Sequence, residues 1–94
     1  MSTNEERIKL FKTDLEQAFT ALQLSIEDES HLHAGHAGAA SGGGHFRLRI
    51  VAPEFDSMPT VARHRAVYAA LKRHIPKEIH ALTISALTPK EAGL

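Results

Sequence analysis

The sequence predicts a small α+β domain in which two helices pack on one face of a three-stranded mixed sheet. Two segments carry apolar residues at the spacings of three and four typical of helices, and three shorter segments alternate apolar and polar residues as half-buried strands do. Their order is helix, strand, strand, helix, strand. With 94 residues, the chain is expected to form one domain over residues 1–94, because either half alone would be too small to hold a core.

The first two predicted elements are a helix over residues 4–22 and a strand over residues 24–28. The apolar stripe of the helix consists of Ile8, Phe11, Leu15, Ala18, Phe19 and Leu22. Glu5 and Glu6 are favourable near its positive N-terminal end. The strand is short, and its alternation predicts one buried face.

The second predicted strand spans residues 45–52 and is expected to run antiparallel to the first. It places Phe46, Leu48 and Ile50 on one face, and His45, Arg47 and Arg49 on the other. Pro53 ends it, and a turn leads into the second helix.

The second predicted helix begins near Pro59 or Thr60 and continues to Pro76. A third strand follows over residues 79–87, with His80 on the same face as Leu82, Ile84 and Ala86. Thr88 followed by Pro89 predicts a short helical turn at the C-terminus.

Composition limits the possible functions. Eleven Lys and Arg balance eleven Asp and Glu, so no net field draws the chain to nucleic acid or to an anionic membrane. The absence of cysteine excludes disulfides and thiolate ligands from this chain, so a metal must be held by nitrogen, oxygen or a partner's sulfur. The N-terminus resembles neither a signal nor a transit peptide, and no apolar run approaches about 20 residues, so a cytoplasmic location without membrane association is expected.

The chain contains seven histidines, and three of them, His31, His33 and His36, lie in a predicted flexible loop over residues 29–44. Five of the six glycines lie in the same loop, where they allow the backbone to bend and bring imidazoles together. A metal-binding role is one interpretation, and a solvated surface is the other.

The other histidines are open to similar alternatives. His80 lies in an apolar strand, as either a hydrogen-bonded structural residue or a ligand. His45 lies at the start of a strand, where a structural role is the simpler interpretation. His64 is expected to pack on the second helix or lie at its surface, and His74 to interact with the negative end of that helix.

Basic residues on the second helix suggest a second kind of site. Arg63, Arg65, Lys72 and Arg73 form a basic surface that Arg47 and Arg49 could extend, and the short turn before the helix suggests a helix-turn-helix. A solvated helix face is the alternative. No nucleophile, phosphate-loop or metalloprotease motif is present, so the chain is not expected to be an enzyme.

Several short motifs occur together in one order and spacing. They are Asp28-Glu29-Ser30, the His- and Gly-rich loop, His45-Phe46-Arg47, Phe55, Arg63-His64-Arg65-x-Val67-Tyr68, Ile79-His80-Ala81-Leu82 and Thr88-Pro89-x-Glu91. In combination they resemble the BolA family over residues 24–91. The resemblance implies a domain of the class II KH-like type.

The resemblance also implies a function. BolA-like proteins are non-enzymatic adaptors in iron–sulfur cluster trafficking and iron homeostasis, and they share a [2Fe-2S] cluster with a monothiol (CGFS) glutaredoxin. Glutathione and the glutaredoxin supply thiolates, so the isolated chain is expected to bind no cofactor. The strand histidine of the family corresponds to His80, and the loop position corresponds to His33, with His36 and then His31 as alternatives.

A DNA-binding transcriptional regulator is the second function that the resemblance suggests. The contacts would come from Arg63, Arg65, Lys72 and Arg73. The chain lacks the Gly-x-x-Gly loop with which true KH domains clamp a nucleic-acid backbone. Self-association into a homodimer stays open.

Overall fold

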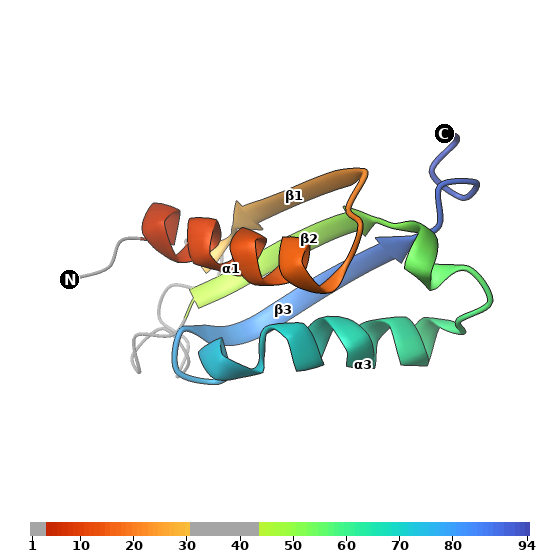
Figure 1. Ribbon diagram of the computed structural model, residues 1–94. Helices are drawn as coiled ribbons and strands as arrows, with labels where there is room; N and C mark the ends of the chain where they lie inside the picture. The colour runs from red at the N-terminus through yellow and green to blue at the C-terminus, as the bar shows by residue number, and fades with distance from the viewer. Residues whose placement is uncertain (1–3, 31–43) are drawn as a thin grey trace.

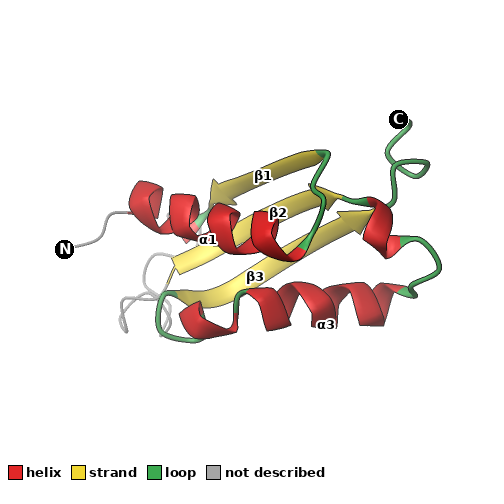
Figure 2. Cartoon of the chain, viewed as in Figure 1, coloured by secondary structure: helices red, strands yellow, loops and turns green. Residues whose placement is uncertain are grey.

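A computed structural model describes residues 4–30 and 44–94 and confirms the predicted fold class. Both helices lie on one face of the sheet, as Figures 1 and 2 show. The elements are α1 (Asn4–Ala18), β1 (Gln23–Asp28), β2 (Gly44–Val51), the 3₁₀ turn η2 (Pro53–Phe55), α3 (Thr60–Ala70), the 3₁₀ turn η3 (Lys72–His74) and β3 (Ile79–Leu87). Within these residues, no helix is both long and apolar enough to cross a membrane.

The sheet has the strand order β1-β2-β3 and is mixed, as predicted. β1 pairs antiparallel with β2, and β2 pairs parallel with β3. Parallel pairing requires a crossover, which α3 provides. The starts of β2 and β3 therefore lie side by side at one end of the sheet (Figure 1).

The core lies between the helices and the sheet. Phe46, Leu48 and Ile50 of the central strand are almost completely buried, which confirms the predicted face of β2. Phe11 of α1 packs edge-on against Phe46 with ring centroids 5.2 Å apart, an arrangement that aromatic pairs favour. Val67 of α3 is buried in the same cluster.

The first helix ends four residues earlier than predicted. The apolar spacing continues to Leu22. However, the backbone N–H of Leu22 donates to the carbonyl of Val51 in β2 at 2.8 Å, so it cannot form a helical hydrogen bond. The N–H of Thr20 donates to the Glu54 carboxylate at 2.8 Å. Phe19 still packs against Phe55, with ring centroids 5.0 Å apart. The apolar residues after Ala18 thus lie in the turn between α1 and β1.

The second helix begins as predicted, with Pro59 as N-cap, but its α-helical part ends at Ala70. The N–H of Leu71 bonds to the carbonyls of both Val67 and Tyr68, and this shared bond tightens the chain into η3. The predicted C-terminal turn is present, because the N–H of Ala92 donates to the carbonyl of Thr88 at 3.1 Å.

The start of β3 contains a β-bulge. Gly44 pairs with Ile79, but His45 pairs with Ala81, so His80 is an extra residue in the ladder. Ile79 is buried, His80 and Ala81 are exposed, and the alternation then resumes with Leu82 toward the core. The prediction that His80 shares a face with Leu82, Ile84 and Ala86 is therefore wrong, because the bulge shifts the alternation by one residue.

Candidate metal site

Two histidines from neighbouring strands lie together where β2 and β3 begin. The rings of His45 and His80 have centroids 5.3 Å apart and planes inclined at 49°. His45 is only 7% exposed, whereas the bulge leaves His80 exposed. An exposed imidazole supported by a buried one can present a ring nitrogen to a metal held outside the chain.

Backbone contacts fix the position of this histidine pair. The N–H of Gly44 donates to the carbonyl of Glu78 at 3.0 Å, which joins the starts of the two strands. The N–H of His45 donates to Ser30 Oγ at 3.1 Å, and its carbonyl accepts from the N–H of Glu29 at 2.7 Å. Ser30 and Gly44, the described residues on either side of residues 31–43, therefore both lie at the histidine pair.

The candidate ligands His31, His33 and His36 belong to that segment and lie outside the described residues. Among residues 4–30 and 44–94, no three His, Asp or Glu side chains gather into a metal site. The chain also has no cysteine. The donor set fits a [2Fe-2S] cluster only in part, because His80 can supply one imidazole and the remaining ligands of such a cluster must come from elsewhere.

The other two described histidines have different surroundings. His74 is 2% exposed and lies between the carboxylates of Asp14 and Glu78, at 2.8 and 3.0 Å. His64 is partly exposed on α3. Neither lies in the pair formed by His45 and His80.

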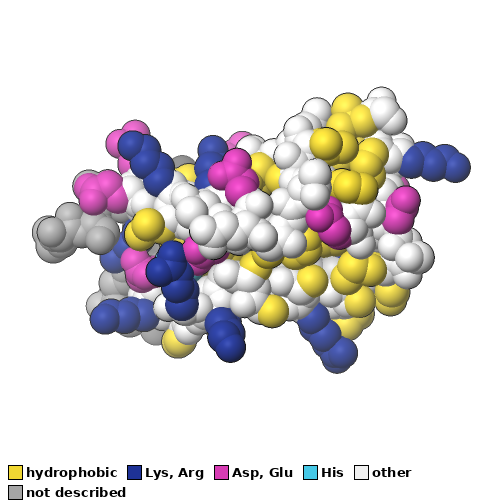
Figure 3. Space-filling view, viewed as in Figure 1, with side chains coloured by type: hydrophobic (Ala, Val, Ile, Leu, Met, Phe, Trp, Pro, Cys, Tyr) yellow, Lys and Arg dark blue, Asp and Glu magenta, His cyan; other side chains and the backbone are white. Residues whose placement is uncertain are grey.

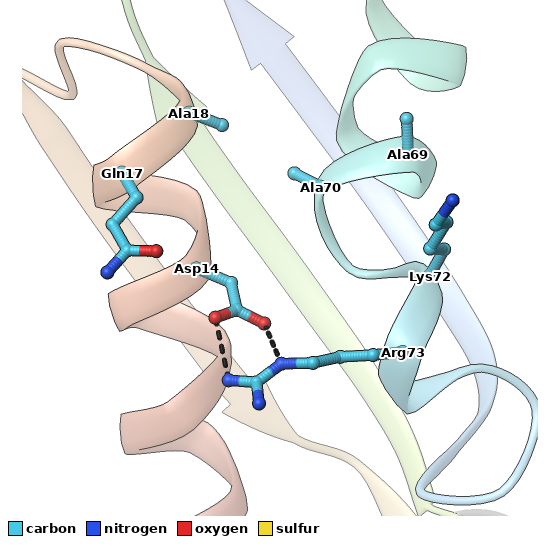
Figure 4. Close-up of a pocket in the computed structure, with 7 residues that line it drawn as sticks. All are labelled: Asp14, Gln17, Ala18, Ala69, Ala70, Lys72 and Arg73. Carbon is cyan, nitrogen blue, oxygen red and sulfur yellow. Dashed lines mark hydrogen bonds and ion pairs between the residues drawn. The ribbon is translucent and has the colours of Figure 1, made fainter.

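Two of the four predicted nucleic-acid contacts are engaged within the protein. Arg63 donates to the carbonyls of Met58 and Ala86 and to the carboxylate of Glu91, at 2.8, 3.0 and 2.6 Å. Arg73 forms two hydrogen bonds of 2.8 Å with Asp14 across a groove of about 400 Å³ between α1 and α3 (Figure 4). These guanidinium groups would have to leave intramolecular partners to bind a phosphate.

The remaining basic residues do not form a continuous positive surface with them. Arg65 and Lys72 are exposed on α3 and η3. On the face that carries the helices, the Lys and Arg side chains along the lower edge are separated by uncharged surface, and acidic side chains lie above them (Figure 3). Arg47 pairs with Glu29 at 3.0 Å, and Arg49 donates to Gln23 at 2.6 Å.

The predicted helix-turn-helix has no full counterpart in the described part of the chain. A single 3₁₀ turn, Pro53–Phe55, precedes α3 in place of a first helix. The first helix of a helix-turn-helix crosses the nucleic-acid backbone, and a turn of three residues is too short for that role.

Comparison with known proteins agrees with this arrangement of strands and helices. The family model for BolA-like protein matches residues 15–91. The chain belongs to the BolA-like family. The solved BolA domain of SufE1 from Arabidopsis thaliana superposes with a TM-score of 0.79 at 38% identity, covering 90% of this chain and 94% of that domain.

Two further BolA-like relatives differ in their names. Protein BOLA1, chloroplastic, from Arabidopsis thaliana is 37% identical over 91 residues, which are 94% of this chain and 57% of the relative. This chain therefore spans little more than half of that protein's length. The DNA-binding transcriptional regulator BolA of Haemophilus influenzae is 34% identical over 83 residues, covering 88% of this chain and 78% of the relative.

The sequence of this BolA-like chain points to His80 as a candidate ligand and to His45 as a structural residue. The signal that would have paired them is the topology. Two strands joined by a helical crossover are parallel, so their first residues become neighbours.

Proposed function

We propose that this BolA-like chain is a non-enzymatic cytoplasmic adaptor that shares a [2Fe-2S] cluster with a monothiol glutaredoxin and glutathione. The observation that carries the proposal is the exposed His80 on a bulge, beside the buried His45 and close to Ser30, the last described residue before the segment that contains His33. The similarity to the BolA domain of SufE1 supports it.

The division of ligands has a chemical rationale. A cluster ligated by imidazole in place of thiolate is less negative and has a higher reduction potential. His80 and His33 would supply the imidazoles, with His36 and His31 as alternatives to His33. The cysteine-free chain depends on its partner for sulfur ligands, so it can hold a cluster only as part of a complex.

The test is to mix the protein with a monothiol glutaredoxin, glutathione, iron and sulfide without oxygen, and to record visible absorption and circular dichroism. We expect wild type to give a cluster spectrum different from that of glutaredoxin alone, and His80→Ala to abolish this difference. His64→Ala is the matched control, because His64 lies on α3 outside the histidine pair. If wild type leaves the glutaredoxin spectrum unchanged, the proposal is wrong.

The same mixture gives a test of histidine ligation. Only a deprotonated ring nitrogen binds a metal, so the cluster shared with this chain should be lost as the pH falls through the histidine range, toward about pH 5. His33→Ala, His36→Ala and His31→Ala would then identify the loop ligand. A shared cluster retained unchanged at about pH 5 would contradict ligation by histidine.

A second candidate function is DNA binding, which the name of the Haemophilus influenzae relative favours. The exposed Arg65 and Lys72 are the side chains best placed to bind phosphates, since Arg63 and Arg73 are engaged within the fold. If DNA is bound, affinity should fall steeply with salt, and Arg65→Ala and Lys72→Ala should each reduce the salt dependence. No binding at low salt would exclude this function.

A further inference from the structure

His74 lies in an unusual setting that the proposed function does not use. Its ring is 2% exposed, and each of its nitrogens faces a carboxylate oxygen: Nε2 is 2.8 Å from Asp14 Oδ2, and Nδ1 is 3.0 Å from Glu78 Oε1. Asp14 belongs to α1, and Glu78 immediately precedes β3. The ring therefore links the first helix to the start of the last strand.

A neutral ring between two ionised carboxylates has one proton too few to donate a hydrogen bond to both of them. An ionised carboxylate only accepts hydrogen bonds, and a neutral imidazole has a single N–H. Asp14 does not carry the extra proton, because the hydrogen bonds from Arg73 hold the pKa of its carboxyl below the usual value. The Arg7 guanidinium lies 3.8 Å from Glu78 Oε2, so this carboxylate also faces a cation besides the ring. The ring is the remaining carrier, with a proton on each nitrogen.

The neighbouring groups determine which contact is lost when the ring gives up a proton. Asp14 is held by two hydrogen bonds of 2.8 Å from Arg73 (Figure 4), whereas the Arg7 guanidinium faces Glu78 at the longer distance of 3.8 Å. The Phe11 ring packs edge-on against His74, with centroids 4.7 Å apart, and limits its movement. Asp14 therefore keeps its contact, and Glu78 becomes the carboxylate that withdraws.

We propose that His74 is a pH-sensitive clamp whose doubly protonated ring holds the start of β3 against α1, and whose deprotonation releases Glu78. Loss of this side-chain contact affects the fold because the backbone of Glu78 bonds to both His74 and Gly44. Its N–H donates to the carbonyl of His74 at 2.8 Å, and its carbonyl accepts from the N–H of Gly44 at 3.0 Å. Release of the side chain loosens the junction between β2 and β3. The proposal is independent of cluster binding.

Nuclear magnetic resonance of ¹⁵N-labelled protein tests the protonation state directly. At the acid end of the range between about pH 5 and 8, the His74 ring should show a proton on both nitrogens. As the pH rises, Nδ1 should lose its proton and Nε2 should keep the one donated to Asp14. A ring with a single proton throughout that range would overturn the proposal.

Amide hydrogen exchange tests the structural consequence. After correction for the intrinsic effect of pH, exchange at Gly44 and Glu78 should accelerate severalfold as His74 loses its proton. In Glu78→Gln, the side-chain amide can donate to the neutral Nδ1, so the acceleration should be lost. Glu16→Gln, on the exposed surface of α1, is the matched control and should behave as wild type. An unchanged acceleration in Glu78→Gln would overturn the proposal, and if that variant does not fold, the wild-type titration decides alone.

Discussion

Gly44 occupies a crowded backbone position beside the histidine pair. A Cβ added there would lie 2.6 Å from Cε2 of the Phe46 ring and 3.2 Å from Ser30 Oγ. The Phe46 ring is itself 2% exposed and packed against Phe11, so it has little room to move away. Glycine is required here because of this close approach.

We therefore expect Gly44→Ala to lower the free energy of unfolding by about 1–3 kcal/mol, the usual cost of overpacking a core. Urea unfolding followed by circular dichroism measures this change. Ser85→Ala, at an exposed position of β3, is the control and should change stability by less than about 0.5 kcal/mol. Equal stability of Gly44→Ala and wild type would show that the side chains of Phe46 and Ser30 can move to make room for a methyl group.

At the scale of elements, the C-terminal turn is fastened to α3 by one carboxylate. Glu91 accepts hydrogen bonds from Arg63 and from the backbone N–H of Thr88, while Thr88 Oγ1 accepts from the N–H of Glu91. This reciprocal pair is a capping box. The hydrogen bond from Arg63 and, to a smaller extent, the one from the Thr88 N–H lower the pKa of Glu91 from 4.5 to about 2.

A carboxyl with a lowered pKa stabilises the folded state only while it is ionised. The contribution of Glu91 is complete above about pH 4.5 and is lost as the pH falls toward 2. We expect Glu91→Gln to be less stable than wild type at neutral pH, and the difference to shrink on acidification. Urea unfolding at a series of pH values measures it. A difference that does not depend on pH would contradict the role of the charge.

Helix α1 packs on the sheet through two buried side chains, Phe11 and Leu15. Phe11 is 1% exposed and touches both Phe46 and His74, whereas its neighbour Leu10 is 44% exposed. Phe11→Ala should lower the free energy of unfolding by about 3–5 kcal/mol, as truncation of a buried Phe does. Thermal unfolding gives the comparison with Leu10→Ala, which should change stability little. Similar losses in both variants would mean that α1 is held in another way.

The elements differ in how well their sequences predict them. Alternation identified all three strands and the buried face of β2, because a strand buried on one face repeats every second residue. The ends of the helices were not predictable, since Leu22 continues the apolar spacing of α1 yet bonds to Val51 of the sheet. The bulge at His80 was also not predictable, because it arises from the pairing of β3 with β2, which is distant in the sequence. His80 could therefore be singled out, but its exposed position could not, while its neighbour His45 follows from the parallel order of the two strands.

For the whole molecule, the balance of charges holds only near neutral pH. When all eleven carboxylates are protonated, 11 Lys and Arg and seven His leave a formal charge of +18. Hydrogen bonds from Arg73 to Asp14 and from the backbone of Thr20 to Glu54 lower the pKa of both carboxyls. These ion pairs and hydrogen bonds are lost on acidification, at the same time as the positive charges begin to repel one another.

We expect the melting temperature to fall steeply below about pH 4, where lowered carboxyl pKa values make unfolding take up protons. Added salt should screen the repulsion and recover part of the loss at about pH 3. Circular dichroism melts at low and high salt measure both effects. A melting temperature insensitive to salt at low pH would show that repulsion contributes little.

The parallel pairing of β2 and β3 also has a consequence for the order of events during folding. His45 and His80 are 35 residues apart in the chain and meet only when the crossover through α3 is complete. Contacts of such long range form late, because closing the intervening loop reduces chain entropy before any contact compensates for it. A nascent or partly unfolded chain can display its histidines, but it cannot present them as a pair. The pair thus exists only in the fully folded protein. A partner that requires both histidines would bind folded chains and not unfolded or partly folded ones.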